Sequence, residues 1–272
     1  MANPVAAEIA PVYTTPASGG AKGVPMSGKL FLLDTNLGLA FGDAPWPEVL
    51  ATHEFAALET TDLEKLDAMM AAHEPHAAFL PIADYHRLLA TGDTHYRGLA
   101  IATSKFTGTT RLPSVLVVRR DDPASGIADL EGARFAYINR SCSSSWFSTA
   151  ILLQAHGKTL SRFLEMVPTP PWQGQVDAVV SGAVRATMLP EDVWLTTPGN
   201  ADTTKVIGRY DGATPALVVA RQDLDAAVAA ALLEALVTWV PRWENVYGPF
   251  RPFYRADVHR FFHDLDRLPP GS

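Results

Sequence analysis

The sequence contains a single cysteine, Cys142, among 272 residues. An internal disulfide and a zinc site built from several cysteines are therefore excluded. Lysine and arginine form no run, and the formal net charge is −7, so the basic stripe typical of nucleic-acid binders is missing. No apolar run approaches the ~20 residues of a membrane-spanning helix. We therefore expect neither a nucleic-acid partner nor membrane insertion, and any anion site must be local rather than the result of overall charge.

The first 28 residues also lack features, namely the basic start and the apolar segment of a signal peptide. They are rich in alanine, proline, glycine and serine, a composition with a low tendency to order. Residues 1–28 are therefore predicted to be a loose leader. The expected location is cytoplasmic if the chain is complete as given, and periplasmic if an export signal was removed from it.

The composition that is present suits a globular protein, with 47% hydrophobic and 19% charged residues. Strand-like apolar runs alternate with helix-like segments, which predicts an α/β fold with mostly parallel sheets flanked by helices. Two polar, strand-poor connections, Ser104–Pro113 and Thr196–Thr204, bracket a middle segment. This pattern predicts an inserted domain at 108–202 and a first domain built from 29–107 plus 203–272.

The stretch "YINRSCSSSW" (Tyr137–Trp146) lies between a strand-like and a helix-like apolar run. The first N–H groups of a helix lack internal partners, and the helix dipole makes that end electropositive. An anion is satisfied there without a lysine. Ser141, Ser143, Ser144 and Ser145 therefore predict an anion-binding helix start. The alternative interpretation is a helix N-cap with more serines than a cap needs.

The longer stretch "DLEGARFAYINRSCSSSWFSTAILLQAHG" resembles the substrate-binding proteins of phosphonate ABC transporters. Their corresponding stretch has the form "DLkGkrfAfvdpnStSGy", and its Ser-Thr-Ser run binds the phosphonate group at a helix N-terminus. Other stretches of this sequence resemble further parts of that family in the same order, between residues 75 and 240: "FLPIADYHRLLA", "SVLVVRRDDPASGIADLEG", "VDAVVSGAVRAT" and "KVIGRYDGATPALVVARQDLDAAVAAALLEAL".

This resemblance implies a two-lobed, type 2 periplasmic-binding-protein fold, with two α/β lobes joined by two crossover strands. Cys142, Ser143 and Ser144 match the Ser-Thr-Ser run of the family, and Ser145 replaces the glycine that follows it. Ligands of open α/β sheets bind at the carboxyl ends of strands. The residues at the ends of the first apolar runs are therefore further candidates for the ligand-binding cleft, namely Asp34, Thr35 and Asn36 after one run and Pro81, Asp84 and Tyr85 after another.

Two departures from the family pattern bear on the ligand. Trp172 and Gln173 stand where the family often has His-Asp, and Arg185 stands where it has an acidic residue. Acidic residues of phosphonate binders hold the amino group of an aminophosphonate, so the resemblance predicts a more anionic or more apolar ligand here. Arg185 and Trp172 are included among the candidate ligand-binding residues, although tryptophan is also a common core residue.

Other chemistry has weaker support. Cys142 at a helix start could be a reactive nucleophile or a substitute for serine, and the second interpretation is favoured because no histidine adjoins it in sequence. His259 and His263 lie one helical turn apart but lack the glutamate of a protease motif. The histidines of "HEPH", His73 and His76, lack a third ligand. We therefore assign no catalytic residue, metal or cofactor.

The function that these features favour is that of a non-catalytic solute-binding protein. It would capture a small oxyanion, such as a phosphonate or phosphate ester, by Venus-flytrap closure of two lobes. Its partners would be that anion and an ABC permease or a sensor. The alternative is a cytoplasmic enzyme on the same fold that resembles chorismate dehydratase of menaquinone synthesis, which has a Thr-Ser pair at the corresponding helix start. A third alternative is a cytoplasmic partner protein that responds to a ligand.

Overall fold

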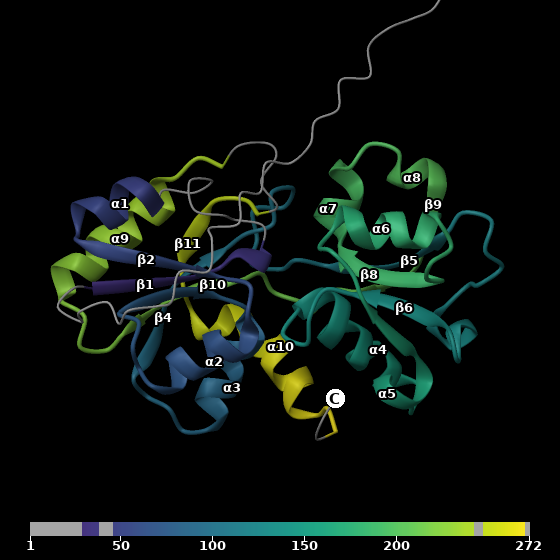
Figure 1. The fold of residues 1–272 in the computed structure, drawn as a ribbon, viewed down its shortest axis with the longest axis horizontal. Helices are drawn as coiled ribbons and strands as arrows, with labels where there is room; N and C mark the ends of the chain where they lie inside the picture. The colour runs from purple at the N-terminus through teal and green to yellow at the C-terminus, as the bar shows by residue number, and fades with distance from the viewer. Residues whose placement is uncertain (1–28, 38–45, 242–246, 270–272) are drawn as a thin grey trace, which may run out of the picture.

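The computed structural model describes residues 29–37, 46–241 and 247–269, which form two α/β lobes side by side (Figure 1). Each lobe is one sheet with helices on both faces. The described chain begins in the first lobe, and its C-terminal end lies between the lobes, where the side chain of Gln154 of the second lobe donates to the carbonyl of Arg267. The two-lobed fold expected from the sequence is therefore confirmed. The predicted leader, residues 1–28, lies outside the described residues. No helix of the described part is both long and apolar enough to cross a membrane.

The first sheet has the strand order β11-β4-β10-β3-β1-β2. β1 pairs in parallel with β2 and β3, whereas β10 runs antiparallel to both β3 and β4, and β11 runs antiparallel to β4. Strands β1 to β4 therefore share one direction, and their carboxyl ends meet at one edge. The strands are β1 (Lys29–Asp34), β2 (Phe55–Thr60), β3 (Ala77–Leu80), β4 (Tyr96–Ala102), β10 (Leu217–Arg221) and β11 (Phe250–Pro252).

The second sheet has the order β7-β6-β8-β5-β9. Here β6 pairs in parallel with β7 and β8, and only β5 runs against its neighbours β8 and β9. Both sheets are thus mostly parallel in direction, with a crossover strand reversed inside each. The strands are β5 (Ser114–Arg119), β6 (Arg134–Tyr137), β7 (Glu165–Pro168), β8 (Ala186–Pro190) and β9 (Thr204–Tyr210).

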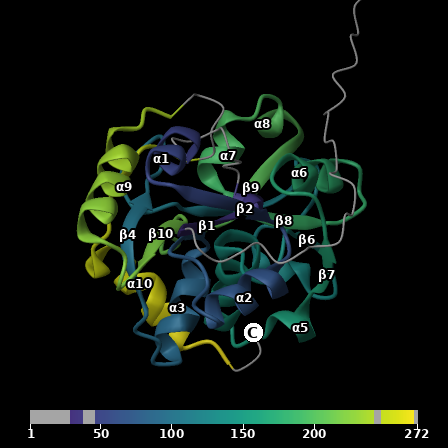
Figure 2. The same ribbon diagram turned by 60° about the vertical axis from the view of Figure 1, so that its left-hand side comes forward.

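The helices pack on both faces of each sheet, as Figure 1 and Figure 2 show from two directions. Aspartate N-caps start two of them: Asp62 accepts backbone N–H groups at the start of α2, and Asp225 does so at the start of α9. The helices are α1 (Trp46–Thr52), α2 (Leu63–Ala71), α3 (Ile82–Ala90), α4 (Thr149–Ala155), α5 (Leu160–Phe163), α6 (Gln173–Val180), α7 (Glu191–Thr196), α8 (Asn200–Thr203), α9 (Ala226–Thr238) and α10 (Arg255–Asp266), with short turns η1 (Thr35–Leu37), η2 (Ile127–Leu130) and η3 (Ser143–Ser148).

The core follows the two-residue period of the strands. Phe31 and Leu33 of β1 pack in the apolar cluster that α1 and α9 cover, whereas Leu32 packs in the cluster on the opposite face, with residues of α2 and α3. The second cluster continues into the other lobe through α10, where Phe261 packs against Tyr210 at the end of β9. The C-terminal helix therefore contributes to packing in both lobes.

Two crossover segments, residues 103–113 and 211–216, connect the lobes. They hydrogen-bond to each other, because Leu112 N–H donates to the carbonyl of Ala213 at 2.9 Å. The sequence division at residue 203 placed the segment Thr204–Tyr210 in the first lobe, whereas this strand, β9, pairs with β5 in the second sheet. Composition reveals a strand but not which sheet it joins, and we place the boundaries in the crossover segments.

Candidate ligand-binding cleft

A pocket lies between the lobes, at the edge where the parallel strands end. Both lobes and both crossover segments contribute to its wall. Its enclosed volume is about 30 Å³, whereas about 10–15 Å³ suffices for one water molecule, so the pocket in this arrangement admits a group of a few atoms. The lining residues are Leu37, Pro81, Leu112, Ile138, Asn139, Ser141, Cys142, Ser143, Ser144, Trp172, Pro190, Thr214, Ala216 and Tyr247.

The serine turn forms one wall of this pocket. β6 ends at Tyr137, and the chain re-enters helix at Ser143 as the π-helical turn η3, which runs directly into α4. Cys142 has extended backbone angles and caps the turn, because its Sγ accepts the N–H of Ser145 at 3.4 Å. The first turn of this helix, with Ser143 and Ser144, therefore faces the pocket. We call residues 141–144 the cradle.

Cys142 behaves as a cap rather than as a nucleophile. Burial raises the pKa of its thiol, which disfavours the reactive thiolate. The pocket-lining residues that the structure describes include no histidine that could take its proton. The sulfur instead accepts a backbone hydrogen bond, as a serine oxygen would.

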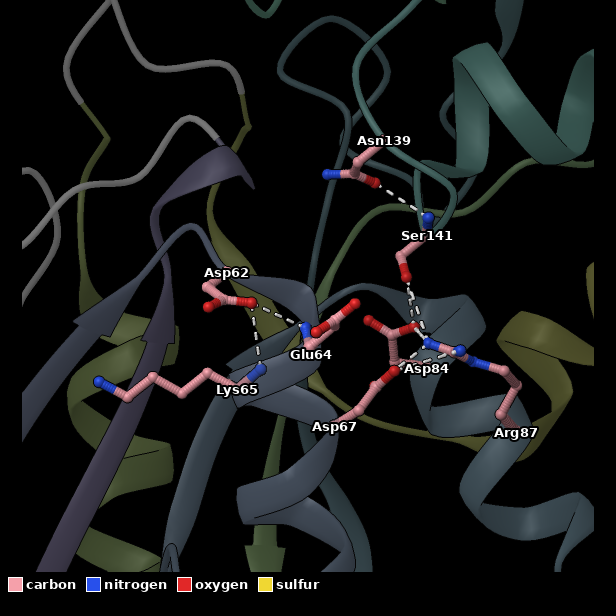
Figure 3. Close-up of polar contacts among 8 residues, drawn as sticks. All are labelled: Asp62, Glu64, Lys65, Asp67, Asp84, Arg87, Asn139 and Ser141. Atoms are coloured by element: carbon pink, nitrogen blue, oxygen red, sulfur yellow. Dashed lines mark hydrogen bonds and ion pairs between the residues drawn. The ribbon is translucent and has the colours of Figure 1, made fainter. Parts of the chain in front are cut away.

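The other two serines of the cluster have different roles, because Ser145 bonds within the turn and Ser141 bonds to the other lobe. Ser145 is fully buried and lies outside the lining, where its Oγ accepts the N–H of Ile138 at 3.2 Å. The expectation that Ser145 contacts a ligand is therefore not matched by its position. Ser141 does line the pocket, and its Oγ donates to Oδ1 of Asp84 at 2.7 Å (Figure 3).

Of the candidates of the first lobe, Tyr85 lies away from the pocket, whereas Asp34 lies near it. Tyr85 is buried in the lobe core, where its hydroxyl accepts the N–H of Gly98 at 3.1 Å and its ring packs against Phe253. It is on the helix face that points away from the cleft. Asp34 is buried near the pocket, since burial raises the pKa of the pocket residue Tyr247 and the charges of Cys142 and Asp34 raise it further. The side chain of Asn36 lies outside the described residues.

Trp172 and Arg185, the two residues that depart from the family pattern, have different positions. Trp172 lines the pocket and adopts a left-handed backbone with φ of 53°, which is rare for a bulky residue. Arg185 lies on the second lobe away from the pocket, where it donates to both carboxylate oxygens of Asp122 at 2.9 and 3.0 Å. The position of Arg185 therefore does not match the expectation that it contacts the ligand, because its guanidinium lies outside the pocket lining and is held by Asp122.

The pocket wall holds two buried hydrogen-bond donors, of which Trp172 was predicted from the sequence and Thr214 was not. Thr214 belongs to the second crossover segment, and its Oγ1 is buried with no hydrogen-bond partner among the described residues. The same holds, within the described part of the chain, for the indole Nε1 of Trp172. A buried donor without a partner is costly, by about 1–3 kcal/mol. Both residues of the pocket wall therefore hold a buried donor that is unsatisfied in this arrangement.

One group of metal-ligand side chains lies away from the pocket. The HEPH histidines were expected to lack a third ligand, but Asp93 and His95 approach His73 from the next loop, with ligand atoms within 4.8 Å of one another. The rings of His73 and His95 are stacked 3.6 Å apart at 24°, so their in-plane lone pairs cannot both reach an ion about 2.0–2.1 Å away. Each ring instead bonds to a different oxygen of Asp93 at 3.0 Å. His259 and His263 are exposed on α10.

A family model matches residues 54–244 of the chain, and its description is "ABC transporter, phosphonate, periplasmic substrate-binding protein". The match covers most of both lobes. The comparison with curated protein sequences gave no match.

Solved structures with the same fold include three that cover most of this chain. PhnD1 from Prochlorococcus marinus in complex with methylphosphonate has a TM-score of 0.67 and 13% identity, covering 88% of this chain and 99% of its own. A binding-protein component of an ABC phosphonate transporter from Pseudomonas aeruginosa has a TM-score of 0.66 and 13% identity, covering 87% of this chain and 85% of its own. XAC2383 from Xanthomonas citri bound to chloride ion has a TM-score of 0.65 and 15% identity, covering 88% of this chain and 98% of its own.

Proposed function

This chain belongs to the family of periplasmic substrate-binding proteins of phosphonate ABC transporters, and on that premise we propose that its cleft captures a small oxyanion. The family consists of non-catalytic solute-binding proteins, and the comparisons give no support to the enzyme alternative. The observation that carries the proposal is the pair of buried, unpartnered donors, Thr214 Oγ1 and Trp172 Nε1, in the wall of the same pocket as the cradle. A ligand rich in acceptor oxygens satisfies both.

The cradle supplies the remaining recognition. Ser143 and Ser144 begin a helix whose first N–H groups and dipole favour negative charge, and their hydroxyls add further donors. Thr214 and Trp172 approach from the crossover segment and from the start of α6. In this arrangement the anion lies between groups of both lobes and of the hinge, so that its binding favours the closed cleft.

The wall of the pocket also limits what the anion carries. Among the described lining residues none is acidic or basic, and Leu37, Leu112, Pro190 and Ala216 are apolar. An ammonium group would find no carboxylate there, so we propose a ligand without an amino group. The enclosed volume of about 30 Å³ favours a short apolar substituent. The methylphosphonate of the Prochlorococcus marinus complex has this chemistry.

We further propose that the protein works in the periplasm and delivers its ligand to an ABC permease. Family membership supports both parts, since the matched family is the periplasmic binding component of such transporters. A permease and an ATPase encoded beside the gene would support this role. Binding of the closed protein to the permease in reconstituted vesicles would test it directly.

A thermal-shift screen tests the capture of an oxyanion. A ligand at a hundred times its Kd stabilises the folded state by about 2.7 kcal/mol. For a chain of this size we expect the melting temperature to rise by about 5–10 °C with a suitable phosphonate, sulfonate, phosphate ester or carboxylate. The proposed function is contradicted if no member of such a panel raises it.

The double variant Ser143→Ala plus Ser144→Ala tests the cradle. Each hydroxyl donates a charge-assisted hydrogen bond to the anion, worth about 1.5–3 kcal/mol. We expect the Kd to rise by about a hundredfold, measured by calorimetry with the best ligand of the screen. The matched control is Ser161→Ala, an exposed serine on the same lobe, which should bind as wild type does. An unchanged Kd for the double variant would place the ligand elsewhere.

Arg185→Ala should leave binding unchanged, in contrast to the expectation from the sequence. Its guanidinium is held by Asp122 and by the carbonyl of Asp129, away from the pocket. We expect the Kd to stay within about a factor of two of wild type. A larger loss, with an unchanged circular dichroism spectrum, would show that Arg185 influences the cleft at a distance.

A further inference from the structure

A polar cluster joins the two lobes beside the pocket (Figure 3). Asp84 lies in the first turn of α3, on the first lobe, and its side chain is 3% exposed. Its Oδ1 accepts the hydroxyl proton of Ser141, from the cradle of the second lobe, at 2.7 Å. The bond therefore spans the interface between lobes that a flytrap closure must make and break.

Arg87, one turn further along α3, completes the cluster. Its Nη2 donates to Oδ1 of Asp84 and to Oγ of Ser141, the second at 3.2 Å. The same guanidinium donates to Asp67 of α2 at 3.3 and 3.4 Å. Asp93, from the loop after α3, lines the same surface hollow as Asp67, Asp84 and Arg87. These are the charged groups that face Asp84 from the neighbouring elements.

The cluster adjoins the pocket, and Ser141 is the member of it that lines the pocket wall. The N–H of Asp84 donates to the carbonyl of Pro81, which is a pocket residue, at 3.1 Å. On the other lobe, the N–H of Ser141 donates to Oδ1 of Asn139, also in the pocket wall, at 2.9 Å. Asp84 itself is not among the lining residues. Breaking its bond to Ser141 would thus free the cradle turn from α3.

We infer that Asp84, Arg87 and Ser141 form a latch between the lobes, and that closing this latch over a bound anion is coupled to the uptake of a proton by Asp84. The inference rests on the proposed function, because it concerns the regulation of the same cleft. The atom that would carry the proton is Oδ2 of Asp84, which is buried and has no hydrogen-bond partner among the described residues. Protonation there removes a buried negative charge and keeps Oδ1 as the acceptor for Ser141.

The sign of the coupling follows from the electrostatics. Burial raises the pKa of Asp84 to about 6, against the opposing effects of the Arg87 charge and of the Ser141 hydrogen bond. Opening moves Ser141 and its turn away and hydrates the carboxyl, which lowers this pKa towards its usual value. The closed form therefore favours the protonated acid, so closure strengthens as the pH falls through about 6 and weakens above it. A bound anion adds negative charge nearby and acts in the same direction.

Calorimetric titration with methylphosphonate between pH 5 and pH 8 tests the latch. The probe has its own ionisation in this range, so the measured quantity is the ratio of the Kd of wild type to that of Asp84→Asn. Because asparagine resembles the protonated acid, we expect this ratio to rise with pH, by about tenfold per unit of pKa difference between open and closed forms. The control is Glu64→Gln, an exposed carboxyl in the first turn of α2, for which the ratio should stay flat.

Arg87→Gln gives a second, independent readout. Removing the guanidinium takes away a charge that lowers the pKa of Asp84, so the midpoint of the pH profile should move to higher pH. A residue with a merely structural role would change the affinity without moving the midpoint. A flat Asp84→Asn ratio together with an unmoved Arg87→Gln midpoint overturns the latch.

A measurement without ligand separates the latch from the proposed function. Small-angle scattering of the protein alone should show a smaller radius of gyration at pH 5 than at pH 8, and Asp84→Asn should be compact at both. If methylphosphonate fails to bind but this difference appears, the ligand assignment is wrong and the latch stands. If the ligand binds but neither the ratio nor the radius depends on pH, the latch is wrong and the proposed function stands.

Discussion

Replacing Ser143 by aspartate should abolish anion binding and leave the fold intact. The new carboxylate would occupy the wall of the pocket at the place that we assign to the anion. Two unit charges about 4 Å apart repel by about 4 kcal/mol at the effective dielectric constant of a protein surface. That energy corresponds to about a thousandfold loss of affinity. The measurement is the Kd of the best ligand from the screen, by calorimetry.

This substitution separates binding from folding better than alanine does. Ser143 is the first residue of the helical turn η3, where a negative side chain interacts favourably with the helix dipole. The melting temperature without ligand should therefore be unchanged or slightly raised. Ser143→Asn, which has the same shape without the charge, should lose much less affinity. If the aspartate variant binds the anion within about tenfold of wild type, the anion does not lie at this helix start.

The serine turn could be predicted because its information is local. A strand, a turn of small hydroxyl residues and a helix start follow one another within one stretch, and backbone geometry alone then gathers the unpaired N–H groups. Trp172 is proposed on a different ground, namely that it stands where the resembled family often has His-Asp. The structure places Ser141, Cys142, Ser143, Ser144 and Trp172 in one pocket wall.

Two things could not be predicted from the sequence: which distant segments of the chain reach the pocket, and which partner each polar or charged side chain bonds to. Thr214 and Tyr247 reach the pocket only because the chain returns between the lobes, far along the sequence from the cradle. Arg185 has the residue type that an anion site would use, but a carboxylate sixty-three positions away already holds it. Tyr85 follows the right strand, yet the helical period turns it into the core, and Asp84 faces the cradle instead.

The latch and the cradle share one residue, Ser141, and this has a physical consequence. Its N–H is bonded to Asn139 within the pocket wall, and its hydroxyl is bonded to Asp84 on the other lobe. In the proposed closure, movement of the cradle would therefore be transmitted to the interface through the side chain of Ser141. With a rigid link of this kind the two lobes are either closed and fully bonded or open, as a two-state closure requires.

Replacing Trp46 by alanine should give the largest loss of stability. The side chain is fully buried in the first lobe, with ring centroids of Phe31, Phe79 and Phe250 at 5.0, 5.6 and 6.0 Å. Truncating a buried aromatic residue costs about 3–5 kcal/mol, because contacts are lost and a cavity remains. We expect the melting temperature to fall by about 10 °C, measured by differential scanning calorimetry.

The matched variant Trp46→Phe makes this prediction specific. The indole Nε1 of Trp46 is buried without a hydrogen-bond partner among the described residues, so phenylalanine removes that penalty while it keeps a ring in the cluster. The Phe variant should therefore retain most of the stability. Trp46 packs on the face of the sheet that α1 and α9 cover, and it is not a pocket residue, so the Kd of folded Trp46→Ala should equal that of wild type. A loss of affinity in proportion to the loss of stability would instead mean that the anion binds only when this core and the cradle are ordered together.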